Sequence, residues 1–164
     1  MLRRGLALGV VLVTGLAFAG GSGAAAPTQV GCSASDLVSA ITAANAAGGA
    51  SLSLTAKCTY TLTAVNNYWY GPTGLPAISA PITIEGNGAT IERPSSSPVF
   101  RLFFVGADPD ATDTPDFVSP AKGASSLTLQ DLTLAGGAQQ GGASQTGGGG
   151  AGMGGAIYNM GALR

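Results

Sequence analysis

The chain alternates apolar and hydroxyl-bearing residues in short segments, and these segments break at similar places. Ile82-Thr83-Ile84 is followed by Gly86-Asn87-Gly88, and Leu127-Thr128-Leu129 is followed by Gln130-Asp131. Alternation with a period of two is the pattern of a strand with one buried face. Gly and Asn readily adopt the positive φ angles that sharp corners require. We therefore predict short strands that bend at corners, with Ile and Leu buried and Thr exposed.

One segment has helical periodicity instead. Residues 35–47 place apolar side chains on one face, with Ser35 as the candidate N-cap and Gly48-Gly49 as the stop. The residues of that face are Leu37, Val38, Ile41 and Ala44. We expect this helix to cover the first strand layer, because an uncovered apolar end invites aggregation.

Strands of this kind can stack as coils, each burying its Ile, Leu or Val side chains against the next coil. Only 9% of the residues are charged, whereas Gly contributes 27 residues, as such a stack allows. We predict an all-β, right-handed parallel β-helix with an N-terminal capping helix. An antiparallel sandwich has the same strand periods, but it predicts tight two-residue hairpins, which are scarce here. The last residue, Arg164, follows the start of a new coil, so we expect the β-helix to be incomplete at its C-terminus.

Several stretches resemble the start of secreted bacterial right-handed β-helix proteins. They are residues 36–45, 58–62 and 82–91. Gly154-Gly155-Ala156-Ile157, with Asn159, is similar to the repeat of the polymorphic outer membrane proteins known from chlamydiae. The resemblance covers residues 35–164. It implies a pectin-lyase-like solenoid with an adhesin-like, surface-exposed role, and it brings no catalytic residues with it.

The N-terminus has the pattern of an export signal. Arg3-Arg4 precedes an uncharged apolar run over residues 5–19, and Ala17-Phe18-Ala19 fits a cleavage site. The run is shorter than the roughly 20 apolar residues that a membrane-spanning helix needs. We predict a signal peptide over residues 1–26, removed at Ala19 or a few residues later, and a mature chain over 27–164 without a transmembrane segment.

The two cysteines are Cys32 and Cys58. In an exported chain, two cysteines are most simply one disulfide, because the compartment is oxidising. Lipid attachment at Cys32 is the alternative, but Gln29 stands where such a signal has an aliphatic residue. We predict a disulfide and a secreted or cell-envelope surface location.

The charged residues exclude several function classes. The net charge is −1 and no basic stretch follows the N-terminus, so a nucleic-acid partner is not expected. Histidine is absent, which excludes histidine-based triads and histidine-ligated metals. No cofactor is predicted.

One segment is rich in aspartate and is a candidate calcium site. Clustered carboxylates can bind Ca²⁺, but the spacing lacks the glycine and glutamate of an EF-hand loop. A solvated loop is the alternative interpretation. The residues are Asp108, Asp110, Asp113 and Asp116.

A carbohydrate-active lyase or hydrolase of the same fold is the alternative function. Such chemistry requires paired carboxylates, or a basic residue beside acidic metal ligands. The dispersed candidates form no recognisable pair, so we assign no catalytic residues and place any active site in missing C-terminal coils. These candidates are Glu85, Glu92, Arg93, Arg101 and Asp131.

Three consecutive aromatic residues, Tyr68, Trp69 and Tyr70, have two interpretations. Their rings could stack on sugar faces, or they could pack the loop against the strands.

Taken together, the sequence predicts an exported, non-enzymatic scaffold that acts in binding or adhesion, with a surface ligand or glycan as its partner.

Overall fold

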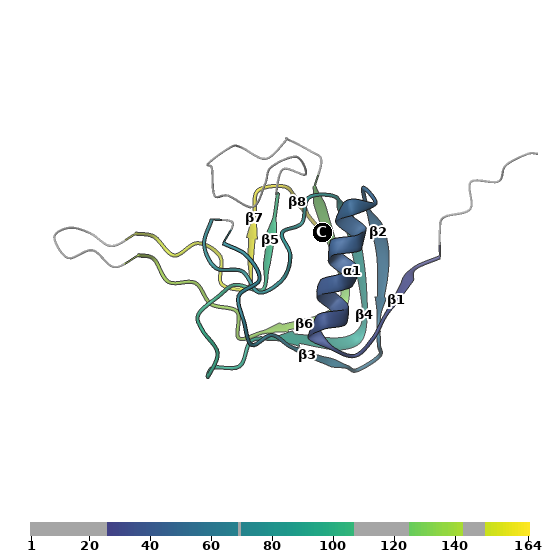
Figure 1. Ribbon diagram of the computed structural model, residues 1–164, viewed down its shortest axis with the longest axis horizontal. Helices are drawn as coiled ribbons and strands as arrows, with labels where there is room; N and C mark the ends of the chain where they lie inside the picture. Colours follow the sequence, from purple (N-terminus) through teal and green to yellow (C-terminus); the bar gives the residue numbers. More distant parts are fainter. Residues whose placement is uncertain (1–25, 69, 107–124, 143–149) are drawn as a thin grey trace, which may run out of the picture.

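The computed structural model describes residues 26–68, 70–106, 125–142 and 150–164 (Figure 1). Within these residues the fold is mostly β, with parallel strands and one helix. Apart from Ala26, the predicted signal peptide lies outside them. The elements are β1 (Thr28–Val30), α1 (Ala34–Ala46), β2 (Ala50–Leu54), β3 (Thr59–Thr61), β4 (Pro81–Glu92), β5 (Phe103–Val105), β6 (Ser126–Ala135), β7 (Ile157–Asn159) and β8 (Ala162–Leu163).

The strands form two parallel sheets. In the larger sheet the order is β1-β2-β4-β6-β8, with β3 beside the second half of β4, and in the smaller sheet β5 pairs with β7. Every pairing between these strands is parallel. Partner strands are separated by long segments, as parallel pairing requires. The antiparallel sandwich is therefore excluded for the described residues, and the parallel arrangement is compatible with stacked coils.

The register places apolar side chains in rows that cross the strands. Leu52 on β2 and Ile84 on β4 are fully buried, whereas on β6 Leu127 is fully buried and Leu129 and Leu134 are only partly buried. Burial of each such side chain contributes roughly 1.5 to 3 kcal/mol. The predicted alternation of buried Ile and Leu with outward Thr is thus confirmed on β4. Two such rows are Leu52–Ile84–Leu129 and Tyr60–Ile91–Leu134.

The predicted turns are corners at which continuous strands bend. Lys57, between β2 and β3, Asn87 within β4 and Asp131 within β6 have positive φ angles of 57°, 52° and 47°. The register between β4 and β6 shifts between Glu85 and Ala89, which accommodates the bend. Asp131 interrupts the alternation of apolar and polar residues in the sequence. In the structure it lies at a corner and is exposed, so the interruption buries no charge.

Helix α1 covers the end of the stack formed by β1 to β4 (Figure 1). Its N-cap is Ser33 and not the predicted Ser35, because the Ser33 hydroxyl accepts a hydrogen bond from the Asp36 backbone N–H at 3.1 Å. The helix stops before Gly48 and Gly49, as predicted, and both glycines have positive φ. The side chains it buries are Leu37, Ile41 and Ala44.

The predicted disulfide between Cys32 and Cys58 is present, with 5.7 Å between the two Cα atoms. It joins the residues before α1 to the residues before β3. Together with the β1–β2 pairing, it fastens the helix to the sheet. No helix in the described parts of the chain is long and apolar enough to cross a membrane.

Candidate functional site

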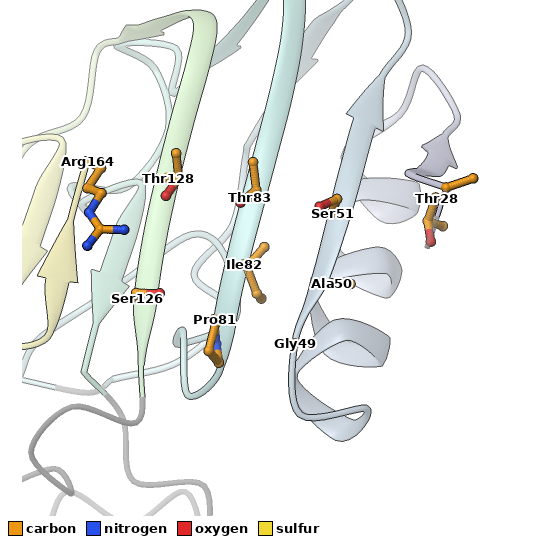
Figure 2. A pocket seen from close by; sticks show the side chains of 11 residues that line it. Thr28, Gly49, Ala50, Ser51, Pro81, Ile82, Thr83, Ser126, Thr128 and Arg164 are labelled. Carbon is orange, nitrogen blue, oxygen red and sulfur yellow. The ribbon is translucent and has the colours of Figure 1, made fainter. Parts of the chain in front are cut away.

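A groove with a volume of about 530 Å³ runs over the outer face of the larger sheet (Figure 2). It crosses β1, β2, β4 and β6 and reaches Arg164 beyond β8. Its hydroxyl-bearing residues alternate along the strands with buried residues, one of which, Ile82, also lines the groove. The polar residues that line it are Thr28, Ser51, Thr83, Ser126, Thr128 and Arg164.

Parallel register arranges part of this lining as a straight row. Ser51 pairs with Thr83, and Thr83 pairs with Thr128, so three hydroxyl-bearing residues lie on neighbouring strands. Arg164 continues the row, because its backbone N–H donates to Leu127 and its carbonyl accepts from Leu129, each at 3.0 Å. Neighbouring strands are about 4.8 Å apart, so the row repeats at that spacing. Figure 2 shows these side chains side by side across the sheet.

The groove is lined by side chains that can form hydrogen bonds and by one positively charged residue. Each Ser or Thr hydroxyl can both donate and accept, and the guanidinium of Arg164 adds donors and a positive charge. Asp, Glu and His are absent from the described residues that line the groove. The lining therefore suits a ligand with many hydroxyl groups, and it supplies no side chain for general acid or base catalysis.

A second row of outward residues crosses the same strands, and its side chains differ in chemical type. Ser53 pairs with Glu85, and Glu85 pairs with Gln130. The hydroxyl of Ser53 accepts a hydrogen bond from the Asn87 side-chain amide at 3.0 Å. Glu85, one of the dispersed catalytic candidates, thus lies in a polar row beside the groove without lining it.

The other dispersed candidates have separate surroundings. Glu92 accepts a hydrogen bond from the Thr61 hydroxyl at 3.1 Å, on the outside of the second half of β4. Arg93 donates to backbone carbonyls, including that of Gly136 at 2.7 Å. Asp131 occupies an exposed corner. The structure does not gather these residues at one site.

Arg101 is buried with no exposed surface. Desolvation lowers the pKa of its guanidinium from the ordinary value, and the electrostatic effect of Tyr158 partly opposes this shift. The sequence gives no signal for this burial, because a lone arginine is ordinarily exposed.

The aromatic residues at positions 68–70 do not share one environment. Tyr70 packs against Phe104 and Tyr158, with ring centroids 5.4 Å and 5.9 Å away. Tyr68 is 66% exposed, and Trp69 lies outside the described residues. Tyr70 thus has the packing role that was one of the two interpretations, while the outward Tyr68 leaves glycan contact a prediction.

The aspartate segment proposed as a calcium site lies outside the described residues. Its members are Asp108, Asp110, Asp113 and Asp116. Elsewhere in the described chain, no group of three or more Asp, Glu, Cys or His residues is placed to hold a metal ion.

Comparison with protein-family models, curated proteins and solved structures finds no significant match for this chain.

Proposed function

We propose that this protein is an exported surface or secreted scaffold that binds a glycan, without enzymatic activity, in the groove over its larger sheet. We further propose that its parallel strands are the first coils of a right-handed β-helix, similar to the adhesin-like polymorphic outer membrane proteins. The row Ser51–Thr83–Thr128 is the observation that carries the binding proposal. It presents hydroxyls at a constant spacing along the direction in which coils are added.

The shape and chemistry of the groove support an elongated, hydroxyl-rich ligand. The groove crosses successive strands, so a polymer lying along it meets the same kind of side chain on each one. The parallel sheet fixes the strand positions, which means that few side chains must be ordered when the ligand binds. A disulfide across the capping segment is consistent with export, because exported compartments are oxidising.

Removing hydroxyls from the row without changing side-chain shape tests the binding proposal. We expect the double variant Thr83→Val/Thr128→Val to lose about tenfold in affinity for the retained glycan, as two hydrogen bonds would account for. Binding would be measured first on an immobilised panel of neutral and acidic polysaccharides, and then by affinity electrophoresis.

The matched control is Thr90→Val/Thr133→Val. These residues pair with each other on the second halves of the same two strands, outside the groove. The control should retain wild-type binding. Equal binding by both double variants would overturn the groove as the site, and retention of no polysaccharide by the wild type would overturn the glycan proposal.

The export proposal has its own test. The intact mass of the protein recovered from the culture medium and from the cell envelope should correspond to a chain cleaved between Ala19 and Ala26, with Cys32 and Cys58 oxidised. A protein that keeps its N-terminal residues and stays in the cytoplasmic fraction would contradict export while leaving the binding measurement unaffected.

A further inference from the structure

The guanidinium of Arg101 is enclosed by three separate segments. Its Nη2 donates to the carbonyl oxygen of Tyr70 at 2.5 Å, and its central carbon lies 5.0 Å from the centroid of the Tyr158 ring. A Cβ atom added to Gly71 would lie 2.9 Å from Nη2 and would also meet the Gln139 amide. Gly71, Gln139 and Tyr158 therefore surround the charged group closely.

The hydrogen bonding of this group is incomplete. Nε and Nη1 of Arg101 are buried and have no hydrogen-bond partner, and the same holds for Oε1 of Gln139. Buried charges in proteins are almost always paired, because removing an ion from water costs several kcal/mol even after relaxation. One carbonyl and one aromatic face do not neutralise a full positive charge.

The described carboxylates do not supply the missing charge. Asp36 accepts a hydrogen bond from Ser33 at the start of α1, and Glu92 accepts one from Thr61. Glu85 lies in the outward row, and Asp131 lies at a corner. Within the described residues, no carboxylate forms an ion pair with Arg101.

The backbone beside Arg101 is held in an uncommon conformation. Tyr70 has φ of 48°, a region that costs a residue with a Cβ roughly 1 to 2 kcal/mol. This conformation directs the Tyr70 carbonyl to Nη2. Strained backbone of this kind persists where the surroundings require it, and it is frequent at binding sites.

We propose that Arg101 binds a small monovalent anion inside the fold, through its Nε and Nη1 groups. The single positive charge requires one negative charge, and the close approach of Gly71 and Tyr158 restricts the anion to a small one. The site is separate from the groove, because Arg101 is absent from the groove lining and points into the protein. It holds the 70–71 segment, β7 and the Gln139 segment together.

Chloride dependence of thermal unfolding tests this site. The purified, disulfide-bonded protein would be melted in sodium chloride, with sodium gluconate keeping the ionic strength constant because the gluconate anion is much larger. We expect the melting temperature to rise by about 4 °C or more for each tenfold increase in chloride above half-saturation. Arg101→Met should abolish this dependence.

Arg93→Met is the matched control. Arg93 is also an arginine, but its Nη1 donates to the carbonyls of Pro94 and Ser97 at 3.1 Å and 3.0 Å. This variant should melt at a lower temperature and keep the chloride dependence. A chloride-independent wild type, or equal dependence in wild type and Arg101→Met, would overturn the proposal.

Two further measurements keep the proposal testable if Arg101→Met does not fold. Crystals of the wild type grown in bromide should show an anomalous peak within hydrogen-bonding distance of Nε and Nη1, and absence of the peak counts against the site. Replacing the four aspartates of residues 107–124 with asparagine should leave the chloride dependence unchanged. A chloride dependence that is absent in the wild type and appears in this variant would instead assign the counter-charge to the chain itself, and the proposal would be wrong.

Discussion

Asn87 donates its side-chain amide to the carbonyl oxygen of Leu54 at 2.8 Å, joining the corners of two neighbouring parallel strands. The same nitrogen lies 3.0 Å from the Ser53 hydroxyl. Asparagine tolerates the positive φ of 52° at this position and supplies a donor that closes the corner. The corner is thus held by a side chain as well as by the strand ladder.

Asn87→Asp should destabilise the fold by about 1 kcal/mol, because a carboxylate accepts hydrogen bonds but cannot donate to Leu54. The change would be measured as the free energy of unfolding in urea. Asn66→Asp is the control, since Asn66 is exposed and its side-chain oxygen accepts from Asn67, a role that a carboxylate keeps. Equal loss in both variants would contradict a specific role for the corner bond.

Replacing both Cys32 and Cys58 with serine should cost about 3 kcal/mol, because the disulfide restricts the unfolded chain across 26 residues of separation. Urea unfolding of the oxidised wild type, the reduced wild type and the double variant would measure this. The reduced wild type and the variant should agree. If reduction changes nothing, the attachment of α1 depends on packing alone.

Gly86→Ala should destabilise the protein by about 1 to 3 kcal/mol through crowding. An added Cβ would meet the backbone carbonyl of Asp131 and lie 2.8 Å from the Cβ of Leu132, on the next strand. Gly142→Ala, where no atom lies within 4 Å of the added Cβ, should be close to neutral. Urea midpoints of the two variants distinguish crowding from a general effect of replacing glycine.

The two serines at the start of α1 should differ in their effects. Ser33→Ala removes the hydroxyl that accepts from the Asp36 N–H and should cost about 1 kcal/mol. Ser35→Ala removes only a contact with the Ser33 hydroxyl and should cost a few tenths of that amount. Thermal melts of both variants decide which serine caps the helix, and a larger loss for Ser35→Ala would reverse the assignment.

The buried rows could be predicted because they follow from local alternation. Ile82 and Ile84 face inward for the same reason that Thr83 faces outward, whichever strand lies beside them. The choice of Ser33 over Ser35 as N-cap could not be predicted, because it depends on backbone angles that the serine residues do not themselves determine. The disulfide could be predicted because only one pairing of Cys32 and Cys58 exists.

The candidate site was harder to predict, because it is assembled by register. Thr83 and Thr128 are outward in any strand model, but their pairing with each other depends on the length of the segment between β4 and β6. Arg164 joins the row only through its backbone bonds to β6. The burial of Arg101 depends on Tyr70, Gln139 and Tyr158, which come from segments far apart in the sequence.

The parallel register also affects the rate of folding and the order in which the strands pair. Ile82 meets Leu127 only after all the residues between them have been closed into a loop, and the pairing of β6 with β8 repeats that requirement. Contacts between residues so distant in sequence make folding slow, on a scale of milliseconds to seconds. Helix α1 and the first strands contact each other over shorter separations. We therefore expect assembly to begin at α1 and the first strands and to proceed by one parallel strand pairing at a time toward the C-terminus.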